Sequence, residues 1–529
     1  MKISAVLAGA AVWALASVMP MPASAADVTI AVRTDASSID PHYHVYVPNR
    51  MVARHIFDAL VKAGPRGQIS PGLAESWSVV GENTWEFRLR HGVTFHDGTP
   101  FTADDVAFTL ARAPNVPNSP SSFSQYTKLI DSVEVVDPFT IRLHTKGPAP
   151  TLPVDLEAIA ILSRHAAEGH PTSDFNNGRA AIGTGPYKFV EWQPGSKLVL
   201  ARNPGYWGGA EPWDQVTIRP IANDGARVAS MLSGDVDMIE GVPAADRARL
   251  AASPKLDLFE CDAFRIIYIH MDSYRDVSPG ITDAQGARLD RNPLKDARVR
   301  RAISLAINRP ALAERLLGGQ AHPAGQYTSP AVAGSSPNLP PQPYDPELAK
   351  RLLKEAGWAD GFSVVLASSN DRFPSDAQVA QAVGQMLARV GIKTDVQPMP
   401  AAMLFSRGSK LEFSMILSGW VGSGEASSPL TALMATYDPN TGMGPSNRGR
   451  WSNKAFDAAL TEALNTLDDA KRNVLYARAA EIAVEEMGVI PVYFTVNTWA
   501  TRKGLTYAPR GDETSLAMGL RPGQSGERK

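Results

Sequence analysis

The chain has 529 residues, of which 44% are hydrophobic and 20% are charged, and its formal net charge at pH 7 is -2. A chain of this length exceeds what one hydrophobic core serves, so we expect two or three lobes. Acidic and basic residues are intermixed, which argues against binding to nucleic acid or to an anionic membrane surface.

The first 25 residues have the pattern of a secretory signal peptide. Lys2 provides a positive start, Ile3–Met19 is an almost unbroken apolar run, and Ala23–Ala25 is typical of a signal-peptidase site. An uncleaved membrane anchor is the alternative, although about 17 apolar residues are marginal for a bilayer span. The only cysteine, Cys261, is far from the cleavage site and cannot carry a lipid there. We therefore predict a periplasmic protein whose residues 1–25 are removed and which has no lipid anchor.

Antiparallel strands are prominent between residues 84 and 201. Thr84–Arg90 alternates apolar and charged side chains, which is typical of a half-buried strand. A capping box formed by Thr102 and Asp105 predicts a helix that begins there. Turn residues between apolar runs indicate two hairpins, Val133–Val136 with Ile141–His144 and Tyr187–Trp192 with Lys197–Ala201.

From about residue 290 the pattern becomes more helical. One helix is predicted after Asp296 and another from Asp345 to Gly357. A strand, a helix and a second strand then form a βαβ unit, which requires a parallel pair with a right-handed crossover. The βαβ segments are Phe362–Ala367, Asp376–Val390 and Ile392–Val396, followed by helices Asn453–Asn465 and Asp469–Met487 and strand Val489–Phe494. The predicted class is therefore α/β with mixed sheets.

The chain lacks the local motifs of acyl transfer, phosphate binding, dinucleotide binding and zinc hydrolysis. We therefore predict that the protein is not an enzyme and uses no cofactor. A secreted hydrolase remains an alternative, because catalytic triads are recognised by geometry rather than by sequence. His42 and His44 could supply imidazoles to a metal ion, but the sequence shows no second pair of ligands, which favours ordinary surface or pocket histidines.

A collinear series of motifs along the chain resembles the family 5 extracellular solute-binding proteins, the oligopeptide, dipeptide and nickel binders of ABC importers. The series covers roughly nine-tenths of the mature chain, and one departure is Asn308, where the family usually has Asp. The matching segments are Gly72–Trp77, Phe87–Arg90, Phe95–Gly98, Ala103–Val106, Gly183–Tyr187, Arg202–Trp207, Ser233–Asp237, Val299–Ala302, Ala306–Arg309, Tyr344–Pro346, Ala356–Gly357 and Gly391–Lys393. Most of these segments are expected to be structural, with Gly183 and Gly185 at a tight chain crossing.

The resemblance implies a large three-domain periplasmic binding protein with two lobes and a hinge. Domain I would comprise residues 26–67, 183–288 and 497–529, domain II residues 68–182, and domain III residues 289–496. Two crossing strands near residues 285–290 and 495–500 would form the hinge. The ligand would be captured between domains I and III by a monomer that delivers it to a membrane permease and its ATPase subunits.

The resemblance also points to ligand-facing residues in domain I and in domain III. Tyr46 and Met51 lie in a run similar to the one that lines the pocket of the nickel-complex binder, although Met51 could instead pack into the following helix. Arg372 follows a strand of domain III, near where peptide-binding relatives place an arginine that pairs with the ligand carboxylate. Arg448 would add positive charge beside it.

The segment that begins at Gly419 bears on the class of ligand. Trp420 could stack on the ligand. Peptide-binding relatives carry an Asp at the position of Ser423, and that Asp pairs with the ammonium of the peptide; Glu425 could replace it only if the loop shifted. The sequence therefore leaves two hypotheses open, a peptide-like solute that carries a carboxylate and a metal chelate of the nickel type.

Overall fold

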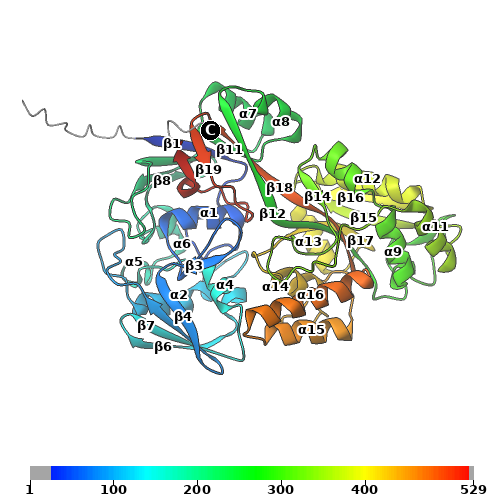
Figure 1. Ribbon diagram of the computed structural model, residues 1–529, viewed down its shortest axis with the longest axis horizontal. Helices are drawn as coiled ribbons and strands as arrows, with labels where there is room; N and C mark the ends of the chain where they lie inside the picture. Colours follow the sequence, from blue (N-terminus) through cyan, green and yellow to red (C-terminus); the bar gives the residue numbers. More distant parts are fainter. Residues whose placement is uncertain (1–25, 524–529) are drawn as a thin grey trace, which may run out of the picture.

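Two long strands connect the two lobes of the molecule. The computed structural model describes residues 26–523, so the predicted signal peptide over residues 1–25 lies outside the described part. β12 (Leu256–Met271) and β18 (Val489–Arg502) run antiparallel across the junction between the lobes (Figure 1). Neighbouring strands extend this pair, so that one mixed sheet continues through both lobes. The predicted α/β class with mixed sheets is confirmed.

Domain I is built around β1 (Asp27–Val32), which pairs in parallel with β10 (Gln215–Pro220) and with β11 (Met238–Glu240). The predicted hairpin of residues 187–201 is confirmed as β8 (Tyr187–Gln193) and β9 (Lys197–Arg202). The remaining helices and strands of this domain are α1 (Val47–Ile56), α5 (Arg164–Ala167), α6 (Thr172–Asn176), α7 (Asp224–Ser233), α8 (Ala244–Ala251), β19 (Leu505–Tyr507) and β20 (Leu520–Pro522). α1 begins with a proline in its first turn, where the missing N–H costs no helical hydrogen bond.

Gly183 and Gly185 lie at the tight chain crossing that the sequence predicts. A Cβ on Gly183 would lie 2.0 Å from the carbonyl oxygen of Ile56, and a Cβ on Gly185 would lie 2.6 Å from the same atom. A side chain fits at neither position, so only glycine lets the chain pass this close to the end of α1.

Domain II contains a four-stranded antiparallel sheet ordered β4-β5-β7-β6, a two-stranded sheet of β2 and β3, and several short helices. The capping box is present, since the Thr102 N–H donates to the Asp105 carboxylate at 2.9 Å. The elements are β2 (Val61–Ala63), β3 (Ile69–Pro71), β4 (Ala74–Gly81), β5 (Thr84–Leu89), α2 (Ala103–Arg112), α3 (Ser124–Thr127), β6 (Ile130–Asp137), β7 (Thr140–Thr145) and α4 (Leu152–Glu157). The core of this domain runs from Leu60 to Ile161, whereas Phe175 and its neighbours pack into the core of domain I. Ile182 packs against the domain II core, so the expected boundary at residue 182 stays a prediction.

Domain III contains the predicted βαβ unit. β15 (Phe362–Ser369) pairs in parallel with β16 (Ile392–Met399), and α12 (Asp376–Ala388) connects them. β17 (Met415–Val421) pairs with β15 and β12 and so joins the unit to the crossing strands. The other elements are β13 (Thr282–Asp283), α9 (Ala297–Ala306), α10 (Arg309–Ala311), β14 (Ala321–Pro323), α11 (Pro346–Glu355), α13 (Ala401–Ser409), α14 (Ser427–Pro429), α15 (Lys454–Leu464) and α16 (Asp469–Glu485).

The crossing between the lobes lies in β12 and β18 themselves. The register of this pair shifts between Asp262 and Ile266, and residues from Ile266 onward belong to the core of domain III. The first crossing therefore precedes the expected 285–290, because the chain is already fixed to domain III there: the Asn292 side-chain amide donates to the Asp272 carbonyl at 2.6 Å. Within residues 26–523, no helix is both long and apolar enough to cross a membrane.

Candidate ligand-binding cleft

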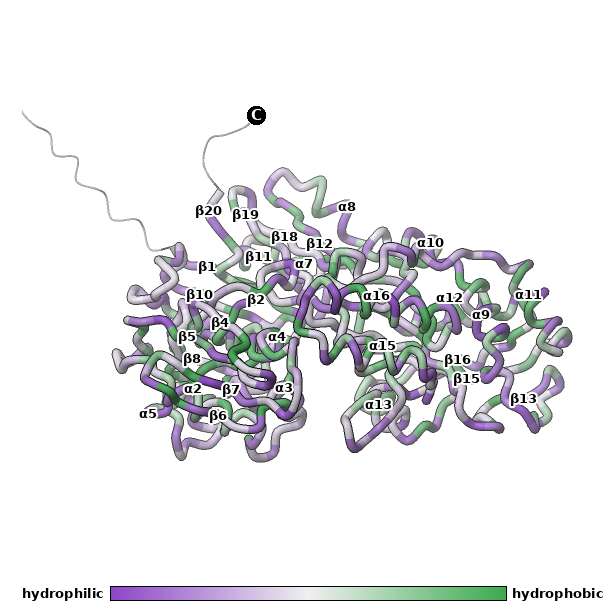
Figure 2. The backbone as a smooth tube through the Cα atoms, turned by 60° about the horizontal axis from the view of Figure 1, so that its bottom comes forward, coloured by the Kyte–Doolittle hydropathy of each residue, from purple (hydrophilic) through white to green (hydrophobic). Residues whose placement is uncertain are grey.

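A cavity of about 1000 Å³ lies between the two lobes. Its walls come from the start of α1, from the α3–α4 region of domain II, and from β17, α14 and the loops of domain III. Two views of the molecule place α4 opposite α15 and α16 across this boundary (Figures 1 and 2). Both lobes therefore contribute side chains to one partly open cavity, which is the arrangement expected of a closing cleft.

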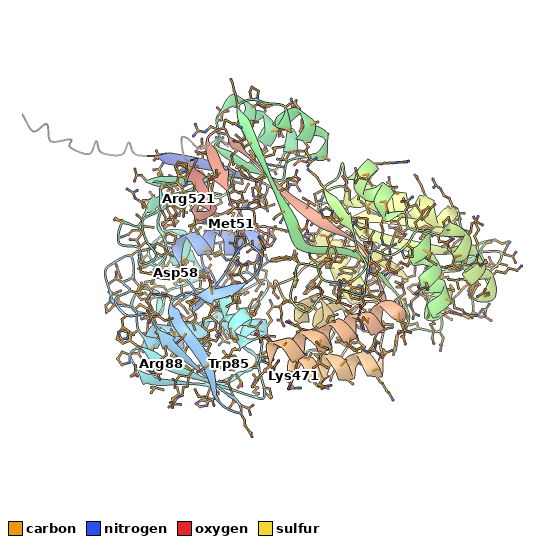
Figure 3. The ribbon with its side chains drawn as sticks, in the orientation of Figure 1. Met51, Asp58, Trp85, Arg88, Lys471 and Arg521 are labelled. Carbon is orange, nitrogen blue, oxygen red and sulfur yellow. The ribbon has the colours of Figure 1, made fainter. Side chains whose placement is uncertain are left out.

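Most of the sequence-predicted ligand residues line this cavity. They are Tyr46, Arg372, Trp420, Ser423, Glu425 and Arg448. Met51 does not: its side chain is 3% exposed and packs in the hydrophobic core of domain I, on the inner side of α1 (Figure 3). Met51 is therefore buried by the packing of α1 against domain I and does not reach the cleft.

The two candidate metal-binding histidines lie in different surroundings. His42 is fully buried, its Nε2 donates to the Ala160 carbonyl at 2.8 Å, and Arg112 contacts its Nδ1. Burial lowers the pKa of His42 to about 4, so this imidazole is a neutral structural group. His44 lines the cavity and stacks on Tyr46 with ring centroids 5.0 Å apart. Within residues 26–523, no cluster of His, Cys, Asp or Glu side chains has the geometry to hold a metal ion.

Guanidinium groups without acidic partners are concentrated in the cavity. Arg50, Arg372 and Arg448 line it, and none of them has a carboxylate oxygen within 4.0 Å among residues 26–523. Arg54, by contrast, is paired with Glu157 and Asp512. The Nε atoms of Arg50 and Arg448 are buried and have no hydrogen-bond partner in the described part of the chain. Buried donors of this kind are costly unless a ligand satisfies them.

The local fold holds the domain III arginines at the cleft. The Arg372 N–H donates to the Asp376 carboxylate at 3.0 Å, which fixes the loop between β15 and α12. Burial, with a further contribution from the nearby Arg265 cation, lowers the pKa of Arg372. The Arg448 guanidinium lies 5.2 Å from the centre of the Phe405 ring. Neither guanidinium has a carboxylate within 4.0 Å among residues 26–523, although Glu513 acts on Arg372 over a longer distance, and this suits both groups to bind carboxylate oxygens.

Trp420 and the glycine-rich loop after it form one wall of the cavity. The Trp420 indole N–H donates to the Ser428 hydroxyl at 3.0 Å, so the ring is held in one orientation. Gly424 has a φ of +81° and touches Gly67 of the other lobe, where a Cβ on either glycine would lie 2.6 Å from the Cα of its partner. Ser423, in the loop between Trp420 and Gly424, is exposed to the cavity.

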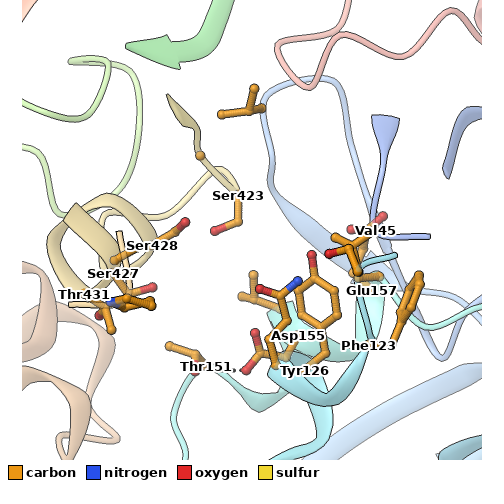
Figure 4. Close-up of a pocket in the computed structure, with 18 of the residues that line it drawn as sticks. Val45, Phe123, Tyr126, Thr151, Asp155, Glu157, Ser423, Ser427, Ser428 and Thr431 are labelled. Carbon is orange, nitrogen blue, oxygen red and sulfur yellow. Dashed lines mark hydrogen bonds between the residues drawn. The ribbon is translucent and has the colours of Figure 1, made fainter. Parts of the chain in front are cut away.

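Domain II supplies a wall that the sequence did not predict. Tyr126 and Asp155 face the hydroxyls of Ser427, Ser428 and Thr431 on domain III (Figure 4). Burial and the facing Glu425 raise the pKa of Asp155 to about 7. α4 is too short to show a helical period, and nothing in its composition distinguishes it from a structural turn. Asp155 lies in the cleft only because domain II faces domain III in the folded protein.

The comparisons with known proteins identify the family. Residues 68–443 match the bacterial extracellular solute-binding proteins, family 5 (middle region). The chain belongs to this family. It is 32% identical to the glutathione-binding protein GsiB of Salmonella paratyphi A over 510 residues, which cover 94% of each chain. GsiB of Shigella dysenteriae is also 32% identical, over 91% of this chain and 92% of the relative.

Solved structures show the same fold. HbpA2 of Haemophilus parasuis has a TM-score of 0.80 at 22% identity, over 94% of this chain and 99% of its own. The murein tripeptide binding protein MppA of Escherichia coli has a TM-score of 0.75 at 24% identity, over 94% and 99%. This family 5 protein is thus a solute-binding component of an ABC importer, and its fold is that of a periplasmic binding protein.

Proposed function

We propose that this family 5 protein captures a peptide-like solute that carries carboxylates. The observation that carries the proposal is the set of unpaired guanidinium groups of Arg50, Arg372 and Arg448 in one interlobe cavity. Arginine binds carboxylates through two parallel N–H···O bonds, and a buried arginine without an acidic partner favours an anionic ligand. Tyr46 and Trp420 add flat apolar surfaces for the rest of the solute.

The relatives support a small peptide of this charge. Glutathione, which the similar GsiB proteins bind, is a tripeptide with two carboxylates and one ammonium group. MppA binds a murein tripeptide. A cavity of about 1000 Å³ has room for a ligand of that size. We therefore take glutathione as the first probe and other acidic di- and tripeptides as the next.

The transport role implies a location and partners. We propose that residues 1–25 are cleaved on export, that the mature protein is periplasmic without a lipid anchor, and that it acts as a monomer without enzymatic activity. Ligand would be bound between the lobes and would favour the closed form in proportion to its greater affinity for that form. The permease and its ATPase subunits would recognise the closed protein.

Isothermal titration calorimetry with glutathione and with its carboxamide analogue tests this function. We expect the wild-type protein to prefer the carboxylate form, and Arg372→Ala to weaken its binding by about 10- to 100-fold, as the loss of a charged hydrogen bond does. Arg389→Ala, an exposed arginine of domain III, serves as the control and should leave affinity unchanged. Absence of any heat or thermal shift with di- and tripeptides at millimolar concentration would contradict the proposal.

A metal chelate is the second candidate, and His44 favours it. This imidazole lines the cavity beside Tyr46, and burial lowers its pKa, which keeps it in the neutral form that binds metals. A nickel–histidine chelate should then give calorimetric heat that His44→Gln reduces. If the chelate gives no heat with the wild-type protein, this candidate is removed.

A further inference from the structure

We propose that Asp155 of domain II and Glu425 of domain III form a subsite that binds the ammonium group of the solute. The inference rests on the proposed function and extends it, because it assigns a second charged group of the ligand and gives domain II a direct role in recognition. Both carboxylates line the same cavity, and they come from opposite lobes. This subsite is separate from the three arginines that would bind the carboxylates of the solute.

Glu425 is only partly satisfied by the protein. The residue is 8% exposed, and its Oε2 accepts a hydrogen bond from the Ser427 hydroxyl at 2.9 Å. Its Oε1 has no hydrogen-bond partner among residues 26–523, although it forms a long ion pair of 3.8 Å with Arg472 Nε. Arg472 is itself bonded to Asp469 at 2.6 Å. This oxygen has almost no accessible surface, so a ligand N–H reaches it when the side chain or the lobes move.

Asp155, unlike Glu425, has no cationic partner among residues 26–523. Its carboxylate accepts a long hydrogen bond of 3.4 Å from the Thr151 hydroxyl, and no Lys or Arg nitrogen lies within 4.0 Å of it in the described chain. Lys128 of domain II has an electrostatic effect on Asp155, but its ammonium lies toward Gly442 of domain III, 3.2 Å from where a Cβ on that glycine would be. Glu157 on the same helix is already bound to Arg54.

The hydroxyl groups around this pair complete the geometry for an ammonium. Ser427, Ser428 and Thr431 face Asp155 across the cavity (Figure 4), and the Thr431 hydroxyl oxygen is buried without a partner in the described residues. An ammonium group has three N–H donors and needs acceptors on several sides, which two carboxylates and a hydroxyl supply. The charged pair would thereby replace the acidic residue that Ser423 does not provide.

Like charges on opposite lobes also couple recognition to closure. When both carboxylates are ionised, they repel each other as the lobes approach, so the ligand-free protein resists closing. A cation held between them converts this repulsion into two attractions. The ligand then binds the closed form better than the open form, which is the condition for shifting the population. A neutral or purely anionic solute would not relieve the repulsion.

The test compares glutathione with N-acetylglutathione by calorimetry in the wild-type protein and in Asp155→Asn. We expect the wild-type protein to prefer the free amine by about tenfold or more, and Asp155→Asn to lose most of that preference while its affinity for the acetylated probe stays the same. Asp131→Asn, an exposed aspartate of domain II outside the cavity, is the control and should keep the preference. Glu425→Gln should act like Asp155→Asn, and because Asp155 is only half-buried its variant remains informative even if Glu425→Gln misfolds.

The outcomes separate the two proposals. Equal affinity of the wild-type protein for the two probes, with binding still dependent on Arg372, would overturn the ammonium subsite alone. An equal loss for both probes in Asp155→Asn would also overturn it, because the aspartate would then act on the fold rather than on the amine. If neither probe binds, the proposed function fails and the subsite fails with it.

Discussion

Arg265 of β12 is bound to Glu513 of the C-terminal segment by two parallel hydrogen bonds of 2.7 and 2.6 Å. Arg265 lies in the crossing strand at the point where its register shifts, whereas Glu513 follows β19 of domain I. Burial alone would raise the pKa of Glu513, but Arg265 and Arg372 hold it below its ordinary value. Glu513 also has a φ of +64°, a conformation that is costly for a residue with a side chain. The ion pair therefore holds a strained backbone at the hinge.

Glu513→Gln should destabilise the protein by about 2 kcal/mol or more, because it leaves the buried Arg265 cation without its counter-charge. Chemical denaturation followed by circular dichroism measures this loss. Glu260→Gln is the matched control, since Glu260 makes a similar two-point contact with Arg247 but on the exposed surface. The control should change stability by less than about 1 kcal/mol, and equal effects of the two variants would contradict the role given to Glu513.

The raised pKa of Asp155 gives a stability effect of known sign. The native state binds the proton of Asp155 up to about pH 7, whereas the unfolded chain releases it near 3.8. Native stability therefore falls as pH rises from about 4 to about 7, since the folded form must then carry a half-buried charge beside Glu425. Asp155→Asn cannot ionise at this position, so it removes this loss of stability.

In thermal melts without ligand, the Tm of Asp155→Asn relative to that of the wild-type protein should therefore rise by about 2 °C or more between pH 5 and pH 8. The difference in Tm between Asp131→Asn and the wild type should stay constant over the same pH range. A constant difference between Asp155→Asn and wild type at all pH values would mean that Asp155 does not titrate near neutrality.

Gly424→Ala should hinder closure, because its new Cβ would lie 2.6 Å from the Cα of Gly67 on the other lobe. Gly98→Ala is a suitable control, since Gly98 has a similar φ of +88° but no neighbouring atom within 4 Å of the added Cβ. Both variants pay the backbone cost of alanine at positive φ, of about 1 kcal/mol. Only Gly424→Ala should also weaken ligand binding and increase the radius of gyration of the liganded protein in small-angle scattering. Similar scattering and affinity for the two variants would show that the Gly67–Gly424 contact does not limit closure.

Trp420→Ala and Met51→Leu should distinguish a residue that lines the cavity from one that packs in the core. Trp420→Ala removes a fixed aromatic wall and should weaken solute binding by about tenfold, as the loss of a stacking side chain does. Met51→Leu preserves volume in the core of domain I and should leave affinity unchanged, at a stability cost below about 1.5 kcal/mol. A larger effect on affinity from Met51→Leu than from Trp420→Ala would reverse our assignment of these two residues.

Local patterns predicted the local structure of this chain well. The alternation in Thr84–Arg90, the Thr102–Asp105 capping box and the βαβ unit of residues 362–396 each depend on neighbours within a few residues, and each is present. The first crossing between the lobes was misplaced, because β12 passes through the hinge as one uninterrupted strand without a turn or a change in composition. No local signal marks a hinge of that kind.

The cleft was predictable only where the family motif or a strand end pointed to it. Arg372 follows the carboxyl end of β15, and this position is exposed to ligand in open α/β sheets. Asp155 lies more than 200 residues away in sequence and meets the same cavity only through the relative placement of the lobes. Met51 shows the opposite case, since its motif suggested the pocket whereas the helical period placed it in the core.

The β12–β18 pair has a mechanical consequence for the importer. Because these strands are hydrogen-bonded to each other on both sides of the junction, the lobes can bend about the register shift near Asp262 but cannot slide freely along each other. Motion is then confined to nearly one coordinate, the opening angle. A membrane partner that touches both lobes could therefore sense the occupied state from the spacing of two surface points, without any contact to the solute.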